Sequence, residues 1–571
     1  MNHATTQSAR PTAADDPARA LDGAPPAAVD GAPPGALARG LERLVTFCLF
    51  AFAVSAPHSI AAAEGVWVLG LLAWAARSAL RPRPGLRRTP LDYALLGFFT
   101  LTIISAVFSY EPDVSIGKLR AASLFTIVYL AAQNVPSRRV LRALVVVLVA
   151  SCTVNVAYTF AVFAKGRGVK VGALAGGGAL YAAGVREGDT LLEIDRAPVR
   201  NLSDLERGLS AQRATREVTV WWPGGKPACW ADERVACVGG VRSEVPLAIG
   251  VERGKFLAGA TPEARLGVAA WSHGREDRAT GFYGQYTTYA EVLQLLGSLA
   301  AGLIVALAVA RRRTPREGRG PRPWAEGARQ KEGGTVTRGR ALLLLAAALA
   351  GIACALLLTV TRASWLAFLV SIFLIVLVGT ASRRAAALVL LGACLAVPAG
   401  LYVLRRQRGV GFIDRHDQST TWRGTVWREA FGVLTSRPRH LAVGVGMDSL
   451  KRRWRDWGMF DGGRLPWGHL HSTPLQIAFE RGLPALAAWL ALLGLYLRML
   501  WRLARREGGD WRERGLALGA AGGTVGFFVS GLVHYNLGDS EVAMVFYFIM
   551  GLALALERLT ARERAKEIAA S

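Results

Sequence analysis

Two histidines and one arginine have the types and spacing most suited to chemistry in this 571-residue sequence. His469 and His471 are separated by a single residue, and Arg423 lies in the basic stretch before them. A neutral imidazole near its intrinsic pKa can accept a proton from an attacking hydroxyl. A guanidinium binds phosphate oxygens in a forked geometry that lysine cannot reproduce. These residue types are suited to accepting a proton and to binding a phosphate group.

The segment around Arg423 predicts a helix that presents one chemical face. Arg423 and Trp427 are four residues apart and share a helix face, whereas Arg428 lies one residue further round and is expected to face water. A zinc site at His469 and His471 is the competing interpretation. We predict no metal site, because no cysteine or carboxylate lies nearby at a suitable spacing.

The basic charge of this region has two interpretations. Between residues 405 and 464 the sequence has thirteen Lys or Arg and six Asp or Glu. Long loops cross a membrane regardless of their charge, so the excess can be incidental. It can also form a basic basin for an anionic lipid pyrophosphate. The histidines have a similar alternative, since an isolated histidine is usually structural.

The elements that must position these residues are membrane helices. The chain is 52% hydrophobic, and its apolar residues occur in blocks of about 20, the length that spans a hydrocarbon core. The net charge of +26 does not indicate nucleic-acid binding, because the basic residues cluster between the apolar blocks. About twelve spans are expected, at 42–60, 62–80, 91–109, 119–134, 139–163, 287–310, 340–361, 364–381, 385–404, 474–500, 515–535 and 540–558.

The basic loops predict the orientation of these spans. Short Lys- and Arg-rich loops favour the cytoplasm, and an even number of spans places all of them, with both termini, on that side. Two long segments then face the opposite side. The expected organisation is a disordered tail (1–40), spans (41–163), a periplasmic insertion (164–286), spans (287–404), a catalytic loop (405–473), and spans with a cytoplasmic tail (474–571).

The insertion has the pattern of a small α+β domain. Residues 171–174 and 218–222 are strand-like, and residues 202–209 are helix-like. The turn Ala182-Ala-Gly-Val-Arg-Glu-Gly-Asp-Thr-Leu-Leu-Glu-Ile-Asp195 resembles that of PDZ domains in bacterial periplasmic proteases, over about residues 170–225. PDZ domains bind an extended peptide at a sheet edge, so a bound peptide is expected, with a spacer fold as the alternative. Cys229 and Cys237 form either a local disulfide or two free thiols.

Several segments, which occur in the same order as in the family, resemble motifs of the O-antigen ligase and polymerase family. They are Arg278-Ala-Thr-Gly-Phe-Tyr-Gly284, Thr361-Arg-Ala-Ser-Trp365, Trp422-Arg-Gly-Thr-Val-Trp-Arg-Glu-Ala430, Gly468-His-Leu-His-Ser-Thr-Pro-Leu-Gln476 with Glu480-Arg-Gly-Leu-Pro484, and Tyr535-Asn-Leu-Gly-Asp-Ser540. The chain departs from the family pattern at Gln285, where a His-Pro-Asn-like turn is usual, and at Ser472, where Asn is usual. The family as a rule lacks the inserted domain.

This resemblance implies an all-α polytopic membrane protein of GT-C type in the bacterial inner membrane. Members move a glycan from undecaprenyl pyrophosphate to an acceptor hydroxyl, such as that of lipid A core, on the periplasmic face. By resemblance, His471, Arg362 and Arg423 would be catalytic. The substrate-binding residues would be Arg278, His469, Trp427 and Asp539. Neither a cofactor nor a metal is expected, because arginines can stabilise the pyrophosphate leaving group.

Other functions remain open at this point. Within the family, a polymerase of O-antigen or exopolysaccharide and a protein O-oligosaccharyltransferase would use the same transferring residues. Outside it, a lipid-linked glycan transporter would carry polar or helix-breaking residues near the midplane of several spans. A PDZ-bearing scaffold would not need the transferase-like segments. Convergence of Arg362, Arg423 and His471 on one outward-facing cavity would favour the enzyme.

Overall fold

A computed structural model describes the protein between residues 35 and 570, with gaps. The gaps are 167, 177–178, 183–184, 186, 195–196, 211–214, 222–243, 251–259, 275–277, 314–327, 381, 383, 385–386, 389–390, 393–417 and 507–508. Cys229, Cys237 and most of the expected span at 385–404 therefore lie outside the described residues.

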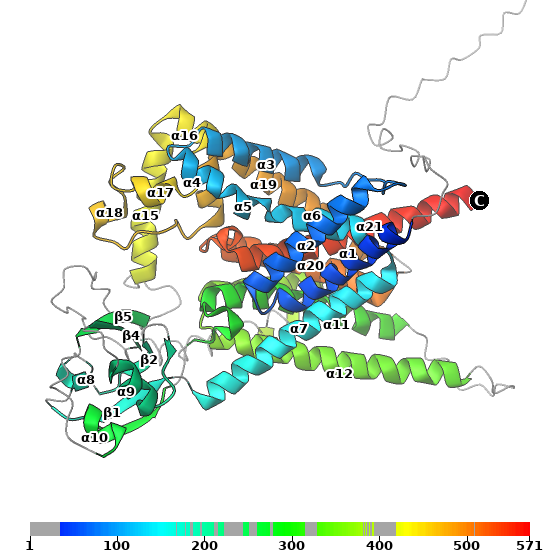
Figure 1. The fold of residues 1–571 in the computed structure, drawn as a ribbon. Helices are drawn as coiled ribbons and strands as arrows, with labels where there is room; N and C mark the ends of the chain where they lie inside the picture. Colours follow the sequence, from blue (N-terminus) through cyan, green and yellow to red (C-terminus); the bar gives the residue numbers. More distant parts are fainter. Residues whose placement is uncertain are drawn as a thin grey trace, which may run out of the picture.

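The described chain is mainly a bundle of long apolar helices (Figure 1). Eight of its helical segments are long and apolar enough to cross a membrane. They lie at Ile60–Ala79, Pro112–Asn134, Arg138–Lys165, Tyr286–Arg312, Arg338–Leu358, Arg362–Thr380, Thr473–Arg505 and Ser540–Ala570. These helices pack into one bundle. A chain with several apolar helices of this length is a polytopic membrane protein.

Most of the expected spans are helical in the structure. The helices are α1 (Ala36–Ser55), α2 (Ile60–Ala79), α3 (Asp92–Val107), α4 (Pro112–Gly117), α5 (Leu119–Ala122), η2 (Ser123–Phe125), α6 (Thr126–Asn134), α7 (Arg138–Lys165), α11 (Tyr286–Arg313), α12 (Ala328–Leu358), α13 (Arg362–Thr380), α19 (Thr473–Arg505), α20 (Trp511–Gly531) and α21 (Ser540–Ala570). The apolar helix α3 is shorter than the eight candidates, and α1 and α20 are not among them. The number twelve therefore stays a prediction.

Small residues let the central helices approach closely. A Cβ added at Gly302 of α11 would lie 2.4 Å from the carbonyl oxygen of Gly515 in α20, and one at Gly519 would lie 2.6 Å from the Leu299 Cα. The Ser371 hydroxyl of α13 donates to the Gly522 carbonyl (2.7 Å) and accepts from Gln294 Nε2 of α11 (2.9 Å). Close packing and interhelical hydrogen bonds of this kind hold helices together in lipid.

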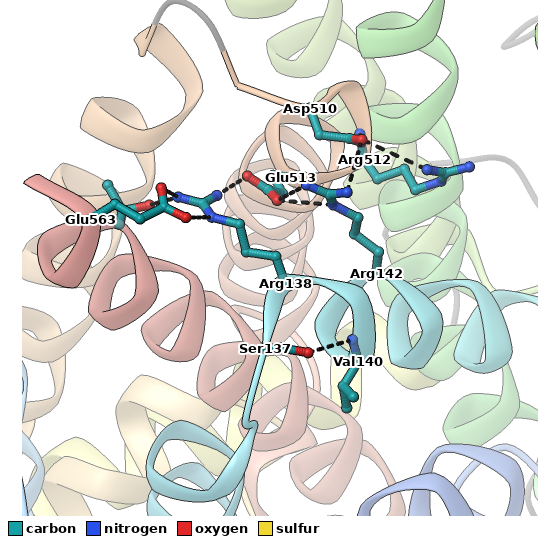
Figure 2. Close-up of polar contacts among 9 residues, drawn as sticks. Ser137, Arg138, Val140, Arg142, Asp510, Arg512, Glu513 and Glu563 are labelled. Carbon is teal, nitrogen blue, oxygen red and sulfur yellow. Dashed lines mark hydrogen bonds and ion pairs between the residues drawn. The ribbon is translucent and has the colours of Figure 1, made fainter. Parts of the chain in front are cut away.

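A network of ion pairs joins three helices at one end of the bundle (Figure 2). Arg138, which begins α7, pairs with Glu513 of α20 and with Glu563 of α21. Arg142 pairs with the same Glu513 (2.8 Å) and with Asp510 (3.3 Å), the residue that caps α20. Glu513 is 5% exposed, so the two arginines compensate a buried carboxylate.

At the other end of the bundle lie the short helices of the expected catalytic loop and the small sheet domain (Figure 1). The loop helices are α15 (Gln418–Thr435), α16 (Pro438–Val443), α17 (Ser449–Arg453) and α18 (Met459–Gly463). Their apolar side chains form a core of their own, which includes Val426, Leu450, Phe460 and Leu470 and continues into Phe479 of α19.

The small sheet domain confirms the strand-like and helix-like segments of the insertion. Its antiparallel sheet has the order β5-β4-β2-β1-β6, with β3 paired to β2. The strands are β1 (Val169–Leu174), β2 (Thr190–Ile194), β3 (Ala197–Pro198), β4 (Thr215–Trp221), β5 (Glu244–Gly250) and β6 (Val268–His273), and the helices are α8 (Ala179–Ala182), α9 (Leu202–Ser210) and α10 (Pro262–Leu266). The PDZ-like domain was expected to end at about residue 225, but the sheet includes two further strands, β5 and β6, that follow this residue.

Helix α19 is interrupted within the first third of its length, at Gly482. Gly482 has φ 82° and ψ 169°, and a Cβ there would lie 2.4 Å from the Ala442 carbonyl oxygen, so only glycine fits. The interruption frees carbonyl groups of the first turns. The Phe479 carbonyl accepts from the Val445 amide, and the Glu480 carbonyl accepts from the Gly446 amide, both at 2.9 Å. The break therefore docks the 442–446 segment onto α19.

Candidate active site

The segment that carries His471 is held from three sides just before α19. Trp427 Nε1 of α15 donates to the Leu470 carbonyl (2.7 Å), and the Leu470 amide donates to Gln476 Oε1 of α19 (2.7 Å). The Thr473 amide donates to the His534 carbonyl beyond the end of α20 (2.9 Å). The position of His471 is thus fixed by α15, α19 and α20 together.

The backbone of His471 adopts a conformation that is rare for its residue type. Its φ is +49°, in the left-handed region that few residues other than glycine occupy. The next residue, Ser472, is extended and caps α19 by accepting from the Leu475 amide. Such strain occurs often at functional sites, where the surrounding contacts impose it.

The two histidines lie against each other and against aromatic rings. The His469 and His471 ring centroids are 4.1 Å apart. Trp422 of α15 contacts His471 edge-on at 4.9 Å, and Tyr535 lies 5.7 Å from His469. Burial, followed by the neighbouring His469, Arg423 and His534, lowers the pKa of His471 to about 3. Burial, followed by Lys451 and His534, lowers the pKa of His469 to about 4.

The expectation of a histidine near its intrinsic pKa is therefore wrong for the protein without substrate. Both imidazoles are largely buried, and neighbouring cations such as Arg423 further disfavour their charged forms. They are uncharged at neutral pH and can accept hydrogen bonds. An anionic substrate beside them would favour the imidazolium form and raise their pKa, so their basicity depends on what is bound.

This low pKa predicts the pH dependence of the free protein. A group with a lowered pKa carries no proton above that value, so neither histidine changes charge between about pH 5 and pH 9. We expect kcat/KM for the reaction proposed below to show no histidine inflection in that range, as measured in a set of buffers at constant ionic strength. An inflection near the ordinary imidazole value of about 6.5 would contradict this environment.

Arg423 belongs to the same cluster. It lies one turn before Trp427 on α15, and its charge contributes to the lowered pKa of both histidines. Arg428, on the other side of the helix, is exposed, as its position one residue further round predicts. The face of α15 that carries Arg423 and Trp427 therefore lies over the histidine segment.

A buried carboxylate forms hydrogen bonds with the segments that surround the histidines. Glu480 of α19 is 2% exposed, and its Oε1 accepts from Gln476 Nε2 (2.8 Å) and from the Asp448 amide (2.9 Å). Tyr535 donates its hydroxyl to Glu480 Oε2 (3.4 Å). These bonds link α19, the loop after α16 and the segment after α20 around the histidines.

Arg278 and Arg362 lie together at the turn between α12 and α13. Arg362 begins α13, and the Trp365 indole donates to the Leu356 carbonyl (2.8 Å), which closes the turn between α12 and α13. The Ala279 amide donates to the Leu358 carbonyl (2.9 Å), which places the Arg278 segment on the same turn. Arg278 stacks over the Tyr286 ring at 3.9 Å.

Asp539 lies beyond α20 in a second polar group. Its Oδ2 accepts from the Thr288 hydroxyl of α11 at 2.5 Å. Burial and the neighbouring Glu541 raise its pKa well above the usual range, so it favours the protonated form. The sequence did not single out the pair beside it, in which His534 Nδ1 lies 2.7 Å from Glu291 Oε1. A carboxylate within an apolar span, such as Glu291, was the signal available.

No cluster that could hold a metal ion occurs among the side chains that the structure describes. The site brings together two imidazoles, an arginine and a tyrosine at one end of the helix bundle. Such a site can orient a hydroxyl and bind an anion.

The fold and site define a polytopic membrane protein with a polar site at one end of its helices. Residues 345–490 match the family model described as O-Antigen ligase. The matched segment contains Arg362, Arg423, Trp427, His469 and His471. This match supports the resemblance to that family and a function in membrane glycan transfer. No curated protein matches the chain.

Proposed function

We propose that this protein transfers a glycan from an undecaprenyl-pyrophosphate donor to an acceptor hydroxyl at the periplasmic face of the inner membrane. The observation that carries the proposal is the cluster of Arg423, His469 and His471 inside the segment that resembles O-antigen ligase. In the membrane orientation that we propose, both termini lie in the cytoplasm, and the catalytic loop and the sheet domain lie in the periplasm.

The reaction is a direct displacement at the anomeric carbon. The acceptor oxygen forms a bond to that carbon, the bond to the pyrophosphate oxygen breaks, and the electron pair leaves with the pyrophosphate. One such displacement inverts the anomeric configuration. The acceptor proton passes to His471, whose pKa rises when the anionic donor lies beside it. Alternatively, His471 orients the hydroxyl as a hydrogen-bond acceptor.

The arginines stabilise the leaving group in this proposal. Arg423 lies close enough to influence the charge of both histidines, so a pyrophosphate that it binds is next to the proposed base. Arg362 and, with a smaller share, Arg278 would act on the same anion from the turn between α12 and α13. His469, Trp427 and Asp539 would hold the substrate and the loop in place.

We propose that no metal takes part, because the arginines can supply the positive charge that a divalent ion supplies elsewhere. Purified protein in lipid nanodiscs should release undecaprenyl pyrophosphate from the glycan-linked donor equally well with and without EDTA. Loss of release in EDTA, restored by Mg²⁺ or Mn²⁺, would contradict metal independence. The size distribution of the product distinguishes a ligase, which attaches one finished glycan, from a polymerase, which forms a ladder.

The sheet domain would bind an extended peptide in this scheme, as PDZ domains do. It has an apolar core of its own, formed by side chains such as Val171, Leu191 and Leu205, and β5 and β6 end its strand order. A peptide can add to such an edge. Hydrogen exchange on the full-length protein tests this, because an added peptide protects the amides of the strand it joins. If no peptide of a library changes the hydrogen exchange of the domain, the domain is a spacer and not a peptide-binding module.

A further inference from the structure

His534 and Glu291 form a largely buried histidine–carboxylate pair that the reaction above does not use. His534 Nδ1 lies 2.7 Å from Glu291 Oε1, and the two side chains are 13% and 3% exposed. Glu291 belongs to α11 and His534 follows the end of α20, so the pair joins two helices of the bundle. Within the described part of the chain, no Lys or Arg forms an ion pair with Glu291, so the imidazole is the group that can compensate its charge.

The hydrogen bond to Glu291 orients the imidazole of His534 for proton transfer. An ionised carboxylate only accepts hydrogen bonds, so the proton of the neutral ring lies on Nδ1 and the lone pair lies on Nε2. None of the described residues forms a hydrogen bond with Nε2, and part of the side chain is open. A histidine that a carboxylate holds through one nitrogen, with the other nitrogen open, has the arrangement of a general base.

The histidine–carboxylate pair lies next to His469 and His471. The His534 carbonyl accepts from the Thr473 amide (2.9 Å) and from the Thr473 hydroxyl (3.1 Å), and Thr473 is only two residues after His471. The residue after His534 is Tyr535, whose ring lies 5.7 Å from that of His469. His534 also contributes to the lowered pKa of both histidines, and such effects weaken with distance. The pair and the proposed base therefore belong to one site.

His471 and His534 differ in the charges that would surround a proton bound to them. An imidazolium at His471 would lie beside Arg423, which disfavours it. The bound pyrophosphate offsets this effect only until it leaves with its lipid after each transfer. An imidazolium at His534 has the carboxylate of Glu291 beside it throughout the cycle. A fixed counter-charge of this kind stabilises a proton taken from the acceptor after the product has left.

We infer that His534, held by Glu291, takes over the proton that His471 removes from the acceptor hydroxyl. The inference rests on the proposed function and adds a step after the displacement. The bond between the proton and His471 breaks, and a bond to His534 Nε2 forms, directly or through one water molecule. His471 is then neutral for the next acceptor, and the proton leaves His534 for water. Charge balances, because the acceptor loses one proton and water gains it.

His534 acts through His471, and Glu291 acts through His534, so both are positioning residues. Turnover kinetics of the full-length protein in lipid nanodiscs test their role. His534→Gln keeps an amide that can donate to Glu291 but cannot take a proton. We expect its first turnover to proceed at nearly the wild-type rate. Its steady-state rate should fall by about 10²-fold, the lower end of what proton transfer by a positioned side chain contributes.

The predicted result is a burst of undecaprenyl pyrophosphate followed by slow release. Glu291→Gln should show the same burst, because it removes the fixed counter-charge. The matched control is His273→Gln, which changes an exposed histidine on β6 of the sheet domain and should turn over as wild type does. A wild-type steady-state rate in His534→Gln would overturn the inference, and so would an equal loss in the first and later turnovers.

Added imidazole separates proton transfer from a structural role of the pair. A small base that diffuses to the site can take the proton from His471, so imidazole should raise the steady-state rate of His534→Gln and leave its first turnover unchanged. A diffusing base does not replace a lost packing contact. A slow variant that imidazole does not rescue, with a lowered unfolding temperature, would assign His534 to packing and overturn the inference.

Nitrogen NMR of the resting protein with isotope-labelled histidine tests the pair without turnover. Loss of a signal in His534→Gln, or in His534→Asn if the former does not fold, identifies the ring. We expect a neutral ring with its proton on Nδ1, and a shift of this signal in Glu291→Asp, which withdraws the carboxylate by one methylene. An imidazolium at neutral pH, or a proton on Nε2, would overturn the inference, because neither ring has room for the proton.

These experiments distinguish the inference from the proposed function. If wild type never releases undecaprenyl pyrophosphate from the donor, the transferase proposal fails and the proton handover fails with it, whatever the NMR signal shows. If wild type transfers glycan and His534→Gln sustains the same steady-state rate, only the handover fails.

Discussion

Replacing His471 with alanine should lower the rate of glycan transfer by about 10²- to 10⁴-fold, the usual contribution of a general base. The segment that carries the imidazole is held by contacts from α15, α19 and the residues after α20, and the ring lies against those of Trp422 and His469. Since burial, followed by neighbouring groups such as Arg423, keeps it neutral, it is ready to accept a proton once an anionic donor is bound. The measurement is single-turnover release of undecaprenyl pyrophosphate.

The matched control for this variant is His471→Asn. Asparagine tolerates the left-handed backbone at this position better than alanine does and can still form hydrogen bonds, but it cannot take the proton. If His471 is the base, both variants should stall while their thermal unfolding remains close to that of wild type. If His471 only orients the hydroxyl, Asn should keep much of the rate. Wild-type rates in both variants would remove His471 from the mechanism.

Replacing Arg423 with glutamine should lower kcat by about 10²- to 10³-fold, because one preorganised charge aimed at the leaving group is worth ~3 kcal/mol. The effect should appear mainly in kcat, since negative charge on the pyrophosphate oxygen grows as the glycosidic bond breaks. Arg423→Lys should recover only part of the rate, because an ammonium keeps the charge without the forked geometry.

Arg428 supplies the matched control on the same helix. Arg428→Gln changes the net charge of α15 equally, but its side chain is exposed on the other side of the helix. We expect wild-type rates from this variant. Equal losses from Arg423→Gln and Arg428→Gln would show that only the general basic field of the loop matters, and the specific role of Arg423 would be wrong.

The membrane helices were predictable because their signal is local. A run of about 20 apolar residues must become a helix in lipid whatever its neighbours are, so most of the expected ranges coincide with helices of the structure. The strands and the helix of the inserted domain were also found from local pattern, for example in β1 and α9. Of the two strands after residue 225, β5 pairs with the preceding β4, but β6 pairs with β1 far earlier in the sequence, which a local pattern does not reveal.

Individual site residues were partly predictable, and their environment was not. The spacing of Arg423 and Trp427 placed them on one face of α15, and the sequence drew attention to the His-x-His pair. The low pKa of His471 depends on burial and on neighbours such as Arg423 of α15, which meet it only in the folded protein. The interruption of α19 had a signal in Gly482 and Pro484, but the docking of the 442–446 segment into it required the structure.

Arg481 shows the limit of motif-based analysis most clearly. It stands within the Glu480-Arg-Gly-Leu-Pro484 motif, where neighbouring residues drew attention for their likeness to a family. Its burial and its contact with Phe98 depend on α3, which lies almost 400 residues earlier in the sequence. Long-range packing of this kind leaves no local trace.

The most direct test of the central claim is an experimental structure of the protein with bound undecaprenyl pyrophosphate. If Arg423 and His471 form one transferase site, a phosphate oxygen should lie within about 3 Å of the Arg423 guanidinium, with the reacting end of the lipid beside the His471 ring. A lipid whose pyrophosphate lies on another face of the bundle, away from both side chains, would contradict the claim.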